Sequence, residues 1–151
     1  PMSNVTYSSL IPILKQQLHK MDTKKGVDYL MRFTRYAFNY ETDTEQFGKE
    51  KRLSAEQTLL YNHSDCEDRS AFFFYLVREI YDLPMIVLSY PKHVTVAVNF
   101  GHKLGMDAIK YKGNYFAICE PSSQKIDLKI GEMLPEWRKQ EYQVVYEYKT
   151  R

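Results

Sequence analysis

The sequence is short of several features that would assign a class of protein at once. No window approaches 18 consecutive apolar residues, so we expect no transmembrane helix. The N-terminus lacks a basic start followed by an apolar run, so no signal peptide is expected. The formal net charge of the 151 residues is only +2, which is too small a bias to indicate nucleic-acid or membrane binding.

Cysteine is also scarce, and the potential ligand side chains show no metal-binding spacing. Cys66 and Cys119 are the two cysteines; they do not make a disulfide framework, and because their contexts differ we expect no bridge between them. Neither a metal nor another cofactor is expected. Pro1 precedes Met2, which is compatible with a piece of a longer protein, so compartment and oligomeric state stay unassigned.

The pattern of apolar residues predicts one domain with helices first. We expect a helical part over residues 1–53 and a core over about 54–149. A capping-box pattern at 54–57 predicts a short helix that begins there. The segment 71–81 is apolar on nearly every side, which predicts a buried central helix that ends before Pro84.

The C-terminal half changes to the two-residue period of strands. In residues 94–100, valines alternate with smaller or polar residues, and Lys112-Gly113-Asn114 is typical of a hairpin turn. A short helix is expected over 134–140. The expected strands are 85–90, 94–100, 108–111, 115–120 and 143–149. Helices followed by an antiparallel sheet predict the α+β class.

Cys66 stands in a pattern that favours a reactive thiol. Ser64 and Glu67 are three apart, which is again a capping box and predicts that a helix begins at Ser64. Cys66 would then lie in the first turn, where free backbone N–H groups and the helix dipole favour thiolate, the nucleophilic form. The alternative is a small core cysteine at a helix start.

A nucleophilic cysteine needs a base and a residue that orients the base. His93 begins the strand over 94–100, and small residues on its own face, Thr95 and Ala97, would let the cysteine helix lie close. The alternative is a histidine that merely opens a strand. Glu120 ends the apolar strand over 115–120 and is well placed to hold the His93 ring. His19 and His102 are expected at the surface.

Three blocks of this sequence resemble bacterial transglutaminase-like domains, a branch of the papain-like thiol enzymes. Residues 64–68, Ser-Asp-Cys-Glu-Asp, look like the family's Gly-Asp-Cys-(Glu/Asp)-Asp block. Residues 91–98 look like its His-bearing strand, and 118–122 like its Asp-Pro-Thr block. Residues 130–135 are similar to a segment that often follows in Bacteroidetes-type members. The resemblance covers about 54–135, with Ser64, Glu120 and Ser122 as departures from the family pattern.

The resemblance implies a papain-like fold and a thiol acyl-transfer reaction on a protein or peptide substrate. Cys66 would be the nucleophile, His93 the base and Glu120 the orienter, with hydrolysis as the expected outcome. The backbone N–H of Cys66 and a second donor would stabilise the oxyanion; the candidates are Gln57, Asn62 and His63. Two alternatives stay open, a catalytically inactive binding module and a protein-crosslinking transglutaminase.

Overall fold

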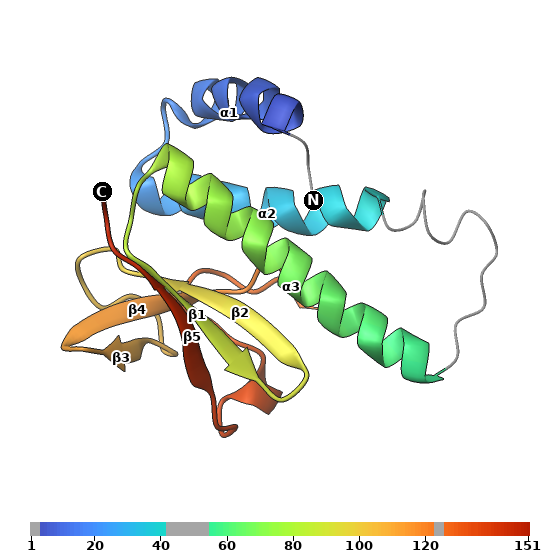
Figure 1. Ribbon diagram of the computed structural model, residues 1–151. Coiled ribbons are helices and arrows are strands. Elements are labelled where there is room, and N and C mark those ends of the chain that lie inside the picture. The colour runs from blue at the N-terminus through green and yellow to red at the C-terminus, as the bar shows by residue number, and fades with distance from the viewer. Residues whose placement is uncertain (1–3, 42–54, 123–125) are drawn as a thin grey trace.

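The computed structural model describes residues 4–41, 55–122 and 126–151, and within them the side chains of 8–36, 66–122 and 126–151. This part of the chain is α+β, as expected, with three α-helices and a curled antiparallel sheet of five strands. Figure 1 shows the three helices on one side of the sheet, with α3 running diagonally across it.

Two amphipathic helices, α1 (Asn4–Leu18) and α2 (Thr23–Glu41), come first. Each turns one apolar stripe toward the core, and Leu14 and Leu18 are the buried residues of α1. The buried side chains of α2 recur at helical spacing: Val27, Leu30, Met31, Thr34 and Arg35. The helical character expected for the N-terminal part is therefore confirmed over residues 4–41, while residues 42–53 lie outside the described residues. Both α1 and α2 pack against the third helix.

The third helix, α3 (Ala55–Ile80), corrects the expected boundaries. The sequence predicted one helix from residue 54 and another from Ser64, but a single helix of 26 residues spans both. The capping box at Ser64 does not start a helix, because no proline or glycine between residues 55 and 80 interrupts the preceding one. The chain leaves α3 at Asp82, whose φ is +52°, two residues before Pro84.

The centre of α3 forms the core, as predicted. Phe73 and Leu76 have no exposed surface, and burial of each such side chain stabilises the fold by about 1.5–3 kcal/mol. The expectation of burial on nearly every side is wrong in detail, since Ala71 is exposed and Phe74 and Tyr75 are half-buried. One side of this segment therefore faces open space instead of the core.

The sheet has the order β3-β4-β2-β1-β5, and every neighbouring pair is antiparallel. A short 3-10 helix, η2 (Pro135–Trp137), lies within the expected helix at 134–140. The strands, which lie close to the predicted ranges, are β1 (Met85–Tyr90), β2 (His93–Val98), β3 (Ile109–Tyr111), β4 (Asn114–Cys119) and β5 (Gln143–Tyr148).

Two tight turns set the register of the sheet. Tyr90 pairs with His93 across Pro91-Lys92, and Lys92 takes a φ of +64°. Lys112 and Gly113 both have positive φ, +49° and +84°, between β3 and β4. Positive φ at both central residues belongs to the turn type that matches the twist of a hairpin, so the predicted hairpin is confirmed.

The face of β2 that meets α3 is not the expected one. Val96 and Val98 pack in the cluster beneath α3, whereas Ala97, and by alternation His93 and Thr95, belong to the other face. All six residues of β2 are buried, since the strand lies between β1 and β4 with packed layers on both faces. Alternation between larger and smaller residues therefore did not reveal which face the helix covers.

Candidate active site

His93 lies at the centre of a chain of polar contacts at one end of the sheet. It is the first residue of β2 and only 6% exposed. Its Nδ1 lies 3.6 Å from the sulfur of Cys66, and its Nε2–H donates a hydrogen bond of 2.7 Å to Oε2 of Glu120. The structure thus brings together the three residues singled out from the sequence, although they come from α3, β2 and the end of β4.

Cys66 reaches His93 from the middle of α3, not from its first turn. It lies eleven residues after the helix start at Ala55, and it is half-buried. The expected assistance from a helix N-terminus is therefore wrong, because the dipole effect is confined to the terminal turn. The backbone N–H of a mid-helix residue bonds to the carbonyl four residues earlier, so this group is not free to donate to an oxyanion.

Glu120 is held from several directions. The residue is only 1% exposed. Besides His93, the side chain of Ser122 donates a hydrogen bond of 2.6 Å to Oε1, and the Ser122 backbone N–H donates a longer one of 3.3 Å. Ser122 therefore holds one carboxylate oxygen while the other faces the imidazole.

Burial and hydrogen bonding oppose each other in this pair. Burial by itself would lower the pKa of His93, but hydrogen bonds to Cys66 and Glu120 outweigh it and raise that pKa to about 10. Burial would likewise raise the pKa of Glu120, but the hydrogen bond from His93 and its positive charge bring that pKa below the usual value. The environment therefore favours an imidazolium against a carboxylate.

Trp137 covers the imidazole and was missed by the sequence reasoning. Its ring lies parallel to that of His93, with centroids 5.1 Å apart and planes 8° apart. Tyr90 packs beside both rings, with its centroid 5.7 Å from that of Trp137. The one signal was that this is the single tryptophan of the chain, in a segment that already carried part of the resemblance.

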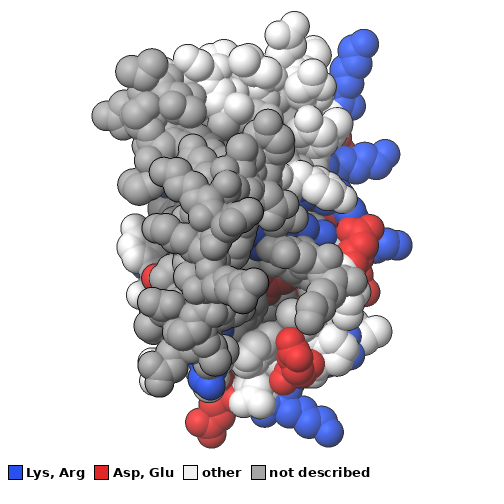
Figure 2. Space-filling model, turned by 90° about the vertical axis from the view of Figure 1, so that its right-hand side faces the viewer, with Lys and Arg blue, Asp and Glu red and all other residues white. Residues whose placement is uncertain are grey.

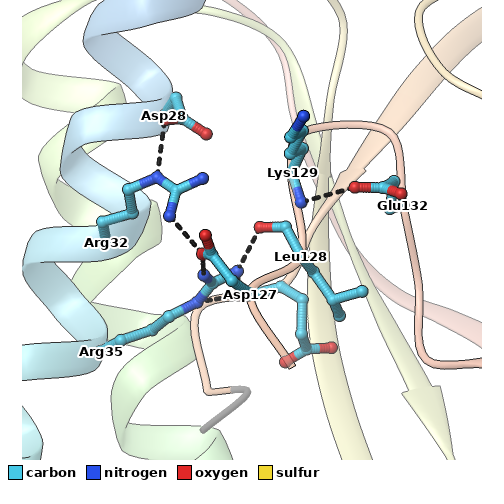
Figure 3. A network of polar contacts seen from close by, with 8 residues as sticks. Asp28, Arg32, Arg35, Asp127, Leu128, Lys129 and Glu132 are labelled. Carbon is cyan, nitrogen blue, oxygen red and sulfur yellow. Dashed lines mark hydrogen bonds and ion pairs between the residues drawn. The ribbon is translucent and has the colours of Figure 1, made fainter. Parts of the chain in front are cut away.

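Arg35 holds the backbone of Glu120 in place through hydrogen bonds to its carbonyl. The sequence reasoning did not single out this residue. Its buried guanidinium donates from Nε and Nη2 to the carbonyl of Glu120, at 3.0 and 2.9 Å. Nη2 also donates to the carbonyl of Leu128 at 2.8 Å, a contact drawn in Figure 3. The available signal was an arginine on the apolar stripe of α2, since a buried charge needs partners.

An outer layer of charges surrounds Arg35. Asp127 accepts from Arg35 at 3.3 Å and also pairs with Arg32, which in turn bonds Asp28 one helical turn earlier at 2.8 Å (Figure 3). Arg32 and Asp127 are considerably more exposed than Arg35. Helix α2 is thereby tied to the segment that follows β4.

Cys119 is the opposite of Cys66. Its side chain is fully buried in β4, and burial strongly raises the pKa of its thiol. Both cysteines are free, so the predicted absence of a bridge is confirmed. The interpretation of Cys119 as a core thiol agrees with its packing in the main cluster.

The other residues considered from the sequence add little to the description of the site. Gln57, Asn62 and His63 belong to α3, but their side chains lie outside the described residues. His19 and His102 are exposed, as expected. Among the described residues, no group of His, Cys, Asp and Glu side chains gathers as a metal-ligand set.

The surface and the helices add two observations. On the face drawn in Figure 2, blue and red side chains lie along the right-hand margin and the lower edge, so its described part carries charges of both signs. No helix in the described ranges combines the length and apolar character needed to cross a bilayer.

Comparison with known proteins returned no match to a family model, a curated protein or a solved structure. The functional interpretation therefore depends on the contacts of this chain and on the sequence blocks described above.

Proposed function

We propose that the chain is a thiol acyl-transfer hydrolase of the peptidase or amidase kind, with a transglutaminase-like variant of the papain-like fold. The observation that carries the proposal is the placement of His93, with Cys66 sulfur 3.6 Å from one ring nitrogen and a Glu120 oxygen 2.7 Å from the other. A nucleophile, a base and an orienter in this order are what thiol acyl transfer requires.

The proposed reaction starts from Cys66 as thiolate and His93 as imidazolium, the form of His93 that its raised pKa favours. Cys66 thiolate attacks an amide carbonyl, and the carbon–sulfur bond forms as the oxyanion develops. His93 imidazolium then gives its proton to the leaving amine, and the carbon–nitrogen bond breaks. In the second half His93 takes a proton from water, whose oxygen attacks the acyl-enzyme, and Cys66 leaves as thiolate. Glu120 keeps Nε2 of His93 protonated and the ring aimed at the sulfur throughout.

The resemblance supports this assignment on matching residues. The Cys66, His93 and Glu120 blocks occur in the family's order, and each contributes one member of the contact chain. Glu120 is one methylene longer than the family's aspartate, and the hydrogen bond from Ser122 accounts for how the longer carboxylate is held.

One observation favours a second candidate, a catalytically inactive binding module. Cys66 lies within α3, so its own N–H is committed to the helix and cannot serve as an oxyanion donor. Oxyanion donors contribute roughly 10²–10³ in rate. An enzyme would therefore need both of its donors from other groups.

Thiol alkylation separates the two candidates. The rate of Cys66 modification by iodoacetamide at pH 7 is measured by mass spectrometry in the wild type and in His93→Ala, Glu120→Gln and His102→Ala. Loss of His93 should slow modification by about 10-fold or more, because the thiolate loses its counter-charge. Glu120→Gln should give a smaller decrease, and the exposed His102→Ala is the matched control with no change.

A Cys66 rate indifferent to His93→Ala would contradict the proposal and leave the binding module in its place. A reactive Cys66 should also turn over peptide amides. Added primary amine then distinguishes hydrolysis from crosslinking, because only a crosslinking enzyme incorporates the amine into its product.

A further inference from the structure

A groove with a volume of about 680 Å³ is lined by residues of α3 and of the strands β1, β2 and β5. This volume is within the range of about 300–1,000 Å³ that small-molecule and side-chain pockets occupy. It is distinct from the Cys66–His93 contact, since neither residue lines it, and none of the steps described above uses it.

One end of the groove lies one helical turn from Cys66 along α3. Glu67 and Ser70 line it and lie one residue and one helical turn after Cys66, while Val94, the neighbour of His93, lines it from β2. The hydroxyl of Ser70 donates a hydrogen bond of 3.2 Å to the carbonyl of Val94, so α3 and β2 are joined at this end. Because Ser70 follows Cys66 by one helical turn, this end of the groove lies about one turn of α3 from the residue that would carry the reacting amide.

The walls of the groove are mostly apolar and partly exposed. Phe74 contributes a ring from α3, and Val87 contributes from β1. On the edge strand β5, Val145 is 56% and Tyr146 53% exposed, and the Tyr146 ring meets that of Phe74 edge-on at 5.5 Å. Large apolar side chains exposed around one hollow are typical of a binding site. Aromatic walls also favour an aromatic occupant, through edge and stacked contacts.

Comparison with a second groove supports the Phe74–Tyr146 groove as the site for an apolar side chain. It shares Ser89 with the first groove and is lined mainly by polar residues of the segment before β5 and the start of that strand, including Gln140, Glu141 and Gln143. Its walls offer hydrogen bonds to solvent or to a peptide backbone. An apolar side chain would lose more contact with water in the Phe74–Tyr146 groove than in this one.

We propose that the groove lined by Phe74, Val87, Val145 and Tyr146 binds an apolar, preferentially aromatic, side chain of the peptide substrate adjacent to the amide that Cys66 attacks. This inference depends on the proposed function and adds a substrate preference to it. The chain would then select aromatic over small or charged residues at that position.

The test uses amino-acyl chloromethyl ketones, in which the Cys66 sulfur displaces chloride and forms a carbon–sulfur bond. N-acetyl-Phe, N-acetyl-Gly and N-acetyl-Lys derivatives are compared, and each rate is divided by the iodoacetamide rate of the same variant. In the wild type the Phe probe should react roughly 10- to 100-fold faster than the Gly probe, in line with burial of one aromatic ring.

Two groove variants and one control complete the design. Ala71 is exposed and lines the groove, so Ala71→Trp should fill it and bring the Phe/Gly ratio to about one. Val145→Asp should lower the ratio independently, since it puts a charge on an exposed wall. Met106, which is 80% exposed and outside the groove, provides the control: Met106→Trp should keep the wild-type ratio.

The outcomes distinguish this inference from the function on which it rests. A wild-type Phe/Gly ratio near one, with Cys66 labelling that still depends on His93, overturns the groove assignment and leaves the proposed function intact. Preference for the Lys probe, or a ratio unchanged in both groove variants, also overturns it. Labelling of Cys66 that ignores His93 removes the proposed function, and the substrate preference with it.

Discussion

The two cysteines occupy regions of opposite character. Cys66 is half-buried on α3, and its sulfur lies 3.6 Å from Nδ1 of His93, whose pKa is raised. Cys119 is fully buried in β4, and its sulfur is 3.6 Å from the carbonyl of Ala117. The same side chain thus has an imidazole partner in one region, and in the other only a weak hydrogen bond to a backbone carbonyl within the core.

This difference shows that closeness in sequence does not determine which cysteine a carboxylate supports. Glu120 directly follows Cys119, yet its carboxylate bonds the ring of His93 and so supports Cys66. Successive residues of a strand point to opposite faces, so Cys119 enters the cluster beneath α3 while Glu120 turns toward the other side. Arg35 then fixes the Glu120 backbone from α2.

The largest expected effect contrasts the two thiols directly. Cys66 should be alkylated in the native protein at least roughly 10³-fold faster than Cys119, because a fully buried side chain reacts only when the core opens. Peptide mass spectrometry of a time course with iodoacetamide measures both rates. Urea should bring the rates together above the unfolding transition. Comparable native rates would mean that β4 is not a stable part of the core.

The next effect contrasts two arginines of one network. Arg35→Met should lower the free energy of unfolding by about 2–4 kcal/mol, because buried carbonyls at Glu120 and Leu128 lose their charged donor. Arg32→Met, whose ion pairs are more exposed, should cost about 1 kcal/mol or less. Urea denaturation gives both values.

The same variants sharpen the role of Arg35 as a positioning residue. Arg35→Met should also slow Cys66 alkylation in the native protein, since Glu120 loses its anchor, and Arg35→Lys should recover part of the rate. Arg32→Met should leave the rate unchanged. Equal effects of the two methionine variants on alkylation would show that Arg35 acts on stability alone.

The last contrast is a pH dependence that belongs to the Cys66 region. The pKa of His93 is raised from 6.5 to about 10, so its contribution to stability is complete below about pH 6.5 and is lost as pH rises toward 10. The pKa of Glu120 is lowered from 4.5, so its contribution is complete above about pH 4.5 and is lost on acidification below that. The two contributions coexist between these values.

His93→Gln isolates this dependence. The stability difference between wild type and His93→Gln should be constant near pH 5–6 and decrease from about pH 6.5 to 10, by at most about 1.4 kcal/mol per pH unit. Urea unfolding at a series of pH values measures the difference. A difference that stays flat or grows with pH would contradict the raised pKa of His93.

Local features of the fold were predictable from the sequence because neighbouring residues determine them. The Lys112-Gly113 turn, where both residues have positive φ, predicted the hairpin between β3 and β4. Pro84 predicted that the preceding helix ends shortly before it. A composition rich in strand-forming residues located β1, and the two-residue period located β2 and β5. The capping box at Ser64 led to a wrong prediction of a helix start, because α3 begins at Ala55 and continues through Ser64 without interruption.

By itself the sequence determined which residues could do chemistry and roughly which elements carry them: Cys66 on a helix, His93 at a strand start and Glu120 at a strand end. Tertiary structure alone decided that Val96 and Val98, not Ala97, face α3. It also placed the Trp137 ring on His93 and bonded Arg35 to the carbonyl of a residue 85 positions away. Such contacts depend on how distant elements pack, and packing energy is shared among many side chains that no local pattern records.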